Sequence, residues 1–177
     1  MKKIISALLA LCLAFSLETA AFADGISISA KSAILVDIAT GRVLTQLNPD
    51  EKLSPASITK VMTILLTVEA LEDGKISLED NVTASQNASS KGGSQIWLKE
   101  GETMTVHELL KATVVASAND ACTALGEYIA GDETAFVAMM NDRAKELGMT
   151  KTKMAQSGID NMSAYIRKMV IDGYVVK

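Results

Sequence analysis

The chain has 177 residues, of which 49% are hydrophobic and 4% aromatic, and its formal net charge is -4 at pH 7. A chain of this length holds one domain, or one domain and a further segment. The acidic balance argues against a nucleic-acid partner bound through overall charge, and the few aromatic side chains argue against surfaces that stack on bases.

The N-terminus has the pattern of a secretory signal peptide. Lys2 and Lys3 form a charged start, residues 4–15 are almost wholly apolar, and residues 21–23 (AFA) are a small-x-small cleavage site. The apolar run is shorter than a comfortable membrane span, and an uncleaved anchor is the alternative interpretation. We therefore expect an exported protein whose mature chain begins at Asp24.

Apolar alternation and periodicity predict the next elements. Residues 31–38 and 43–47 are expected to form the strands of a β-hairpin, with a turn at residues 39–42. A helix is expected over residues 57–71, because an Asp-Gly pair follows its apolar run. Residues 75–104 are polar and rich in turn formers, which fits either a linker or a loop region folded over one domain.

Three more helices are predicted in the second half of the chain. Residues 105–108 (TVHE) form a capping box, which begins a helix that stops near Ser117. A second helix is expected over residues 120–130. A third is expected over residues 133–147, with Gly148 as its C-terminal glycine cap.

Ser57 and Lys60 form the first candidate site. Three residues apart on a helix, they share one face, so the hydroxyl and the amine can meet. A serine becomes a nucleophile when a base takes its proton, and a lysine can be that base when burial lowers its pKa. N–H groups at the helix start would favour an oxyanion. The alternative is a helix-capping serine with an exposed lysine, because Ser-x-x-Lys alone is a weak signal.

Ser117 and Asn119 form a second polar pair, Ser-x-Asn, at the break between two predicted helices. A hydroxyl there can relay a proton, and an amide can hold a carbonyl of a substrate. Taken alone, the pair fits a helix N-cap equally well.

Two further residues have ordinary interpretations. His107 is the only histidine and lies in the first turn of a predicted helix, so we expect it at the surface and outside any catalytic triad. Cys122 is the one cysteine left after signal removal, and we expect a small buried hydrophobe rather than a nucleophile. The sequence holds no His/Cys cluster that would suggest a metal site.

Ser-x-x-Lys with Ser-x-Asn is a motif pair of penicillin-binding proteins and serine β-lactamases. Longer stretches of residues 26–149 resemble one family of them, the D-alanyl-D-alanine carboxypeptidases of the low-molecular-mass penicillin-binding proteins. The stretches that carry this resemblance are SAILVDIATGRVL, LSPASITKVMT, GGSQIWLKEGE, VHELLKATVVASANDA and AFVAMMNDRAKELGM.

The resemblance implies an α+β, β-lactamase/transpeptidase-like fold, an antiparallel sheet flanked by helices, incomplete here at the C-terminus. It implies removal of the terminal D-alanine from peptidoglycan stem peptides through an acyl-enzyme. Ser57 would be the nucleophile, Lys60 its base, Ser117 a proton relay and Asn119 a holder of the substrate amide. β-Lactams would be covalent inhibitors, and no cofactor or metal is implied. The protein would act in the periplasm or at the outer face of the bacterial cytoplasmic membrane, and a peripheral membrane contact is compatible with this.

The sequence departs from the family pattern after residue 149. The third family motif, Lys-Thr-Gly or Lys-Ser-Gly, is missing, and the nearest candidate, residues 151–153 (KTK), lacks the glycine. We therefore expect a signal peptide over residues 1–23, a partial penicillin-binding domain over 24–160 and a divergent tail helix over 161–177. A truncated or chimeric gene and a divergent helix of the parent fold both fit this tail.

Three functions follow from these observations. The first is an envelope serine carboxypeptidase, of which this chain is a whole or a broken form. The second is a catalytically incompetent penicillin-binding-like module that binds peptidoglycan. The third is a DNA-mobilisation accessory protein, because residues 161–177 resemble part of one; the signal peptide and the acidic balance argue against it.

Overall fold

The computed structural model describes residues 28–149 and Met154. The chain divides into two units, Met1–Lys31 and Ser32–Lys177, and every helix and strand below lies in the second. The predicted signal peptide, the KTK stretch and the predicted tail helix lie outside the described residues. Within the described part of the chain, no helix is both long enough and apolar enough to cross a membrane.

The predicted hairpin is present and its first strand is shorter than expected. Strand β1 (Ala33–Val36) pairs antiparallel with β2 (Val43–Leu47). The Asp37 carboxylate closes the turn by accepting hydrogen bonds from the backbone N–H and the hydroxyl of Thr40, at 2.8 and 2.6 Å. Aspartate side chains commonly stabilise tight turns through hydrogen bonds of this kind.

The helix expected over residues 57–71 is two elements in the structure. A 3₁₀ turn, η1 (Ala56–Thr59), leads directly into α2 (Lys60–Glu72). Ser57 therefore lies in the 3₁₀ turn, not in an α-helical first turn as predicted. The buried residues of α2 recur at helical spacing along it, which is why this helix runs through the interior: Lys60, Met62, Thr63, Leu66, Thr67 and Ala70.

Residues 75–104 fold as part of the domain, which excludes the linker interpretation. Strand β3 (Asn81–Thr83) pairs antiparallel with β4 (Thr103–Thr105), and the short helix α3 (Gln86–Ser89) lies between them in sequence. Four side chains of this region are buried with the helices that follow: Val82, Ala84, Ala88 and Leu98.

The remaining helices match the predictions closely. They are α4 (Val106–Val115), α5 (Asn119–Ala130) and α6 (Glu133–Glu146). The capping box that begins α4 is confirmed in both directions. Gly148 has a φ of +68°, as a glycine cap requires, and its N–H donates to the carbonyl of Lys145.

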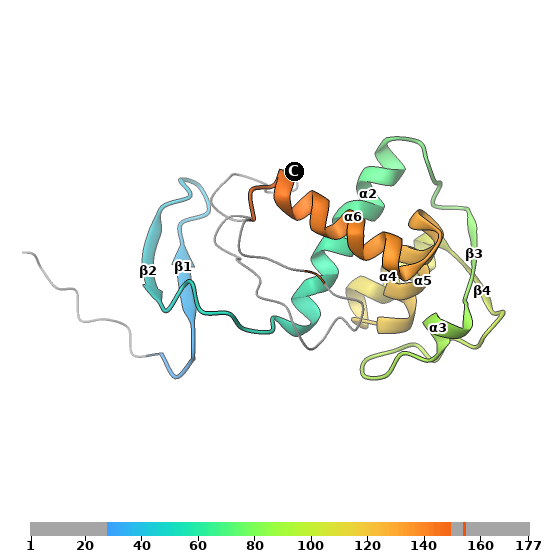
Figure 1. Cartoon of the computed structure of the whole chain (residues 1–177), viewed down its shortest axis with the longest axis horizontal. Helices are drawn as coiled ribbons and strands as arrows, with labels where there is room; N and C mark the ends of the chain where they lie inside the picture. The colour runs from blue at the N-terminus through green and yellow to red at the C-terminus, as the bar shows by residue number, and fades with distance from the viewer. Residues whose placement is uncertain (1–27, 150–153, 155–177) are drawn as a thin grey trace, which may run out of the picture. The chain divides into compact units, whose positions relative to one another are not determined.

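Helices α2, α4, α5 and α6 pack against one another around α5 (Figure 1). One buried cluster joins α4 and α5 to the β3–β4 region, and a second, rich in methionine, joins α2 to α6. The packing of α5 on α6 needs a glycine. A Cβ atom on Gly126 would lie 2.5 Å from the ring of Phe136, closer than two carbon atoms can approach. The core therefore fixes α2, α5 and α6 around one space, in which the candidate site lies.

Candidate active site

The η1–α2 junction brings Ser57 and Lys60 together. Lys60 is the first residue of α2, and its Nζ donates a hydrogen bond to Ser57 Oγ at 3.2 Å. Ala56, directly before the serine, has a φ of +49°, a conformation that residues with a Cβ rarely adopt. Backbone strain of this kind occurs where the surrounding structure holds a side chain in a required place.

Lys60 is buried, and no carboxylate of the described residues pairs with it. The residue is 8% exposed, and no salt bridge within the described residues involves its amine. Burial lowers the pKa of Lys60 because the charged form loses its hydration, and the nearby Cys122 opposes this only in part. Burial thus makes the neutral amine more accessible than in an exposed lysine, and the neutral amine is the form that can accept the proton of a hydroxyl.

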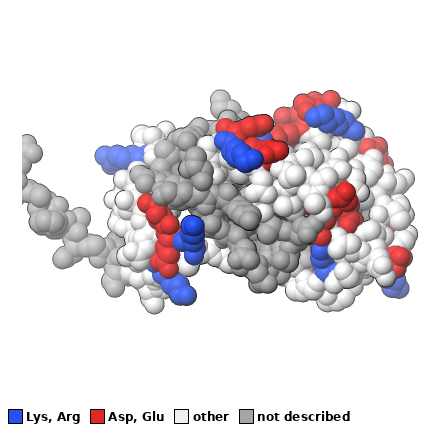
Figure 2. All heavy atoms as spheres, viewed as in Figure 1, with Lys and Arg blue, Asp and Glu red and all other residues white. Residues whose placement is uncertain are grey.

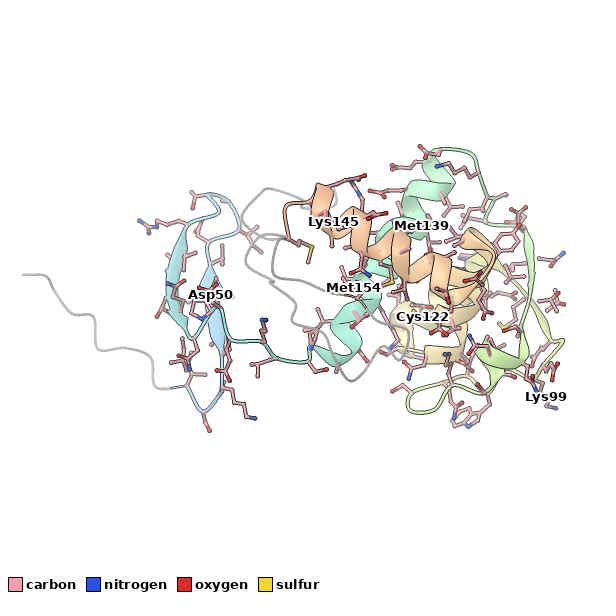
Figure 3. All side chains as sticks on the ribbon, in the orientation of Figure 1. Asp50, Lys99, Cys122, Met139, Lys145 and Met154 are labelled. Atoms are coloured by element: carbon pink, nitrogen blue, oxygen red, sulfur yellow. The ribbon has the colours of Figure 1, made fainter. Side chains whose placement is uncertain are left out.

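Cys122 of α5 lies beside this pair and is labelled in Figure 3. Its Sγ donates a hydrogen bond to Thr63 Oγ1 at 3.2 Å, and burial raises the pKa of the thiol. The residue as a whole is half-buried and borders the cavity described next. The expectation of a small buried side chain therefore holds only in part.

A cavity of about 590 Å³ opens beside the serine and the lysine. Ser57 and Lys60 form one wall, Asn119 at the start of α5 and the loop of residues 90–94 form another, and α6 contributes apolar side chains. The cavity is of the size that binds small organic groups or a short stretch of peptide. On the face shown in Figure 2, acidic and basic side chains are interspersed, without a large area of one sign.

Asn119 binds the loop that faces Ser57 across the cavity. Its backbone N–H donates to the carbonyl of Ser94 at 2.7 Å, and its side-chain Nδ2 donates to the carbonyl of Gly92 at 2.6 Å. Gly93 between them has a φ of +79°, and a Cβ there would lie 2.9 Å from Asn119 Nδ2. The backbone at residue 93 therefore lies so close to the side chain of Asn119 that only glycine fits there.

Ser117 lies in the turn between α4 and α5, with a φ of +54°. It is half-buried and is not among the described residues that line the cavity. The structure therefore brings three of the four predicted residues, Ser57, Lys60 and Asn119, to one cavity. It places Ser117 two positions before Asn119 on the same turn.

Asp120 is a functional candidate that the sequence interpretation missed. Its side chain is fully buried, and its carboxylate accepts hydrogen bonds from the backbone N–H groups of Ile96, Leu98 and Ala121. An aspartate in the first turn of a helix is common for electrostatic reasons alone, so the residue type by itself did not indicate this role. Its position directly after the Ser-x-Asn pair was the one available hint.

A second missed feature is an ion pair at the cavity edge. Lys91 Nζ lies 2.8 Å from a carboxylate oxygen of Glu133, and both side chains are mostly buried. Asn87 bridges this carboxylate to that of Glu127, which also accepts a hydrogen bond from Ser85. The network attaches α3 and the loop after it to α5 and α6.

His107 is exposed on α4, as predicted. In residues 28–149 and Met154, no cluster of His, Cys, Asp and Glu could hold a metal ion.

This constellation of a buried Ser–Lys pair facing an asparagine can be compared with known proteins. The family model Peptidase S11, described as D-alanyl-D-alanine carboxypeptidase, matches residues 18–170. The chain belongs to this family. The resemblance stated from the sequence is thereby confirmed.

Relatives with this name are similar over most of the chain. D-alanyl-D-alanine carboxypeptidase DacF of Bacillus subtilis is 48% identical over 159 residues, which are 86% of this chain and 41% of that protein. DacC of Escherichia coli is 44% identical over 132 residues, 71% of this chain and 33% of that protein. The chain thus spans about two fifths or less of the length of these relatives.

Solved structures confirm the fold class. The D-alanyl-D-alanine carboxypeptidase DacD from Francisella tularensis matches with a TM-score of 0.78 at 32% identity, over 86% of this chain and 38% of that one. Penicillin-binding protein 5 from Haemophilus influenzae matches with a TM-score of 0.77 at 32% identity, over 85% of this chain and 46% of that one. The fold is the α+β fold of the penicillin-binding proteins, and the described residues contain two short antiparallel sheets of it.

Proposed function

We propose that the Ser57–Lys60 pair is the nucleophile and base of a serine D-alanyl-D-alanine carboxypeptidase that acts on peptidoglycan stem peptides outside the cytoplasm. The observation that carries the proposal is the 3.2 Å contact between Lys60 Nζ and Ser57 Oγ in a buried setting that lowers the pKa of the lysine. The names of the relatives supply the substrate class.

In the proposed reaction, Lys60 takes the proton of Ser57 while Oγ attacks the carbonyl carbon of the penultimate D-alanine. The bond from that carbon to the amide nitrogen breaks, and D-alanine leaves with a proton that Ser117 relays from Lys60. Water then attacks the ester, and its proton returns through Lys60 to Ser57 as the shortened peptide departs. This is covalent catalysis, which divides one difficult hydrolysis into two easier steps.

Asn119 would hold the amide backbone of the substrate. Its Nδ2 already donates to the loop carbonyl of Gly92, whereas no described residue donates to its amide oxygen. That oxygen can accept an N–H of the bound peptide. A β-lactam presents a strained amide to the same groups and would acylate Ser57 in the same way.

The sequence of the chain bears on the rate of acylation. The 177 residues contain no Lys-Thr-Gly or Lys-Ser-Gly triplet, which in the family lies on a strand beside the nucleophile. That strand would donate one N–H to the oxyanion, and losing one such donor costs on the order of 10²–10³ in rate. We expect acylation by the chain as given to be slower by about that factor than in a relative that carries the triplet.

A fluorescent penicillin tests the proposal. The wild-type chain and a Ser89→Ala variant should form a covalent adduct that survives denaturation, and a Ser57→Ala variant should form none. Ser89 is the matched control because it is a half-buried serine that does not line the cavity. A wild-type chain that is folded by circular dichroism yet takes up no label, or an adduct that persists in Ser57→Ala, would contradict the proposal.

A second candidate function is binding of peptidoglycan without turnover. The cavity and Asn119 favour it, because both can hold a peptide without an acylation step. Sedimentation of the chain with purified peptidoglycan sacculi, combined with the absence of an adduct in the labelling experiment, would support this alternative.

A further inference from the structure

The first two residues of α5 form hydrogen bonds with every second residue of the loop that spans residues 92–98. Asn119 donates hydrogen bonds to the carbonyls of Gly92 and Ser94. The next residue, Asp120, accepts hydrogen bonds from the N–H groups of Ile96 and Leu98. Two adjacent residues of one helix turn therefore contact four alternating positions of the loop. The half that Asn119 binds borders the cavity, and the half that Asp120 binds does not.

The contacts made by Asp120 are of a stronger kind than the others. The side chain is fully buried, and its oxygens lie 3.1 Å from Ile96 N, 3.0 Å from Leu98 N and 2.9 Å from Ala121 N. No lysine or arginine of the described residues pairs with it. A buried carboxylate needs such donors to offset its lost hydration, and hydrogen bonds to a charged group are about twice as strong as neutral ones.

The residue between the two held N–H groups has an unusual backbone. Trp97 has a φ of +59°, which turns the chain so that the N–H groups on both sides of it converge on one carboxylate. The residue is 75% exposed, so burial of its side chain does not explain this conformation. A left-handed conformation is unfavourable for a residue with a Cβ and persists only when other contacts impose it.

We propose that Asp120 is a positioning residue of the active site. Its carboxylate fixes residues 96–98 from outside the cavity, and this sets where Gly92 and Ser94 present their carbonyls to Asn119. The catalytic part of this inference rests on the proposed function, in which Asn119 holds the substrate. Asn119 can adjust to a substrate without releasing the loop, because Asp120 holds the other half independently.

An Asp120→Asn variant is the decisive change. The amide keeps the shape of the carboxylate but turns an NH₂ group toward N–H groups that donate, so at least one of the bonds is lost. Asp132→Asn is the matched control, because Asp132 also accepts a backbone N–H at a helix start, that of Ala135, and lies outside the cavity. Trp97 is the only tryptophan of the chain, so its fluorescence reports on the loop alone.

Three measurements on the full chain are compared. Asp120→Asn should speed hydrogen exchange of the Ile96 and Leu98 amides by about tenfold or more, because hydrogen bonds to a charged group are lost. The fluorescence anisotropy of Trp97 should fall. In acylation by a penicillin at varied concentration, the concentration for half-maximal rate should rise more than the maximal rate falls, because Ser57 and Lys60 do not touch Asp120. Asp132→Asn should change none of these.

The outcomes separate the possible roles. Unchanged exchange and anisotropy in a folded Asp120→Asn variant would overturn the proposal. A second outcome is faster amide exchange, an unchanged penicillin concentration for half-maximal rate and a smaller fraction of reactive protein. That outcome would show that Asp120 serves stability and not positioning. If the wild-type chain takes up no penicillin, the proposed function fails, while exchange and anisotropy still decide whether the carboxylate holds the loop. An Asp120→Glu variant that restores exchange protection in part would support the role of the charge if Asp120→Asn folds poorly.

Discussion

The two walls of the cavity are held in different ways. On the η1–α2 wall, Ser57 and Lys60 meet because they lie three residues apart on one short stretch of backbone. On the opposite wall, Asn119 and Asp120 bind a loop 22 to 27 residues away in sequence. The first wall contains a buried amine with no ionic partner among the described residues, and behind the second wall lies a buried carboxylate surrounded by N–H donors.

This difference shows how burial can serve opposite purposes. Lys60 is desolvated, and among the described residues the hydroxyl of Ser57 is the hydrogen-bond partner of its amine, so its proton is held more weakly than in an exposed lysine. Asp120 is fully buried but receives backbone hydrogen bonds, so it anchors structure. In the proposed function the first wall reacts and the second stays in place, and the predictions below test that contrast.

The largest effect is expected from Lys60→Met. Removing the base should lower the rate of acylation by about 10²–10⁴-fold, the usual contribution of general base catalysis. Stability should hold or increase, since an apolar side chain replaces a buried amine. Stopped-flow labelling and urea unfolding measure the two effects, and Lys111→Met, at an exposed site on α4, is the control. A comparable loss of rate in Lys111→Met would remove the contrast between the walls.

The pH dependence of stability should also identify Lys60. Its pKa is lowered on folding, so between the folded value and the ordinary value of 10.5 the unfolded chain binds the proton more tightly. The free energy of unfolding should therefore rise with pH through this window in the wild-type chain, relative to Lys60→Met. Acylation should increase as the pH rises through the folded pKa of Lys60, at the lower edge of this window, because the amine of the folded chain becomes neutral there. Parallel stability curves for the two proteins would show that the amine is not desolvated.

On the second wall, Gly93→Ala should have a smaller effect. The new Cβ would lie 2.9 Å from Asn119 Nδ2, and the φ of +79° is unfavourable for alanine. We expect a loss of about 1–2 kcal/mol in the free energy of unfolding. Gly92→Ala is the matched control, because a Cβ there meets nothing within 4 Å. Equal losses in the two variants, measured by urea unfolding, would mean that the loop is not held against Asn119.

The smallest effect should come from the ion pair at the cavity edge. A double-mutant cycle with Lys91→Met and Glu133→Gln should give a coupling energy of about 0.5–1 kcal/mol, because the pair is partly buried. The same cycle at Lys75 and Asp73, a pair exposed to solvent, should give a value close to zero. Thermal unfolding measures both, and a larger coupling in the exposed pair would contradict the expected effect of burial.

Sequence reasoning succeeded where contacts are local. The Ser57–Lys60 contact follows from a spacing of three, and the Thr105–Glu108 capping box and the Gly148 cap are encoded within four residues. The 3₁₀ geometry of η1 was missed because a spacing of three brings side chains together in both kinds of helix.

The rest depends on contacts between distant residues, which periodicity does not reveal. Nothing in residues 75–104 distinguished a linker from a folded loop until the burial of Val82 and Leu98 was known. The role of Asp120 was hidden for the same reason, because its partners are backbone N–H groups whose residue types carry no signal. The fold class came from the family resemblance rather than from any single element.

Gly126 connects the packing of the helices to the room left for a ligand. The ring of Phe136 rests directly on the bare backbone of α5 at this point, and the same ring borders the cavity. Even a methyl group there would have to displace the ring, and the hollow beside the serine would change shape with it. The missing side chain of Gly126 thus determines how close Phe136 lies to α5, and with it the shape of the cavity beside Ser57.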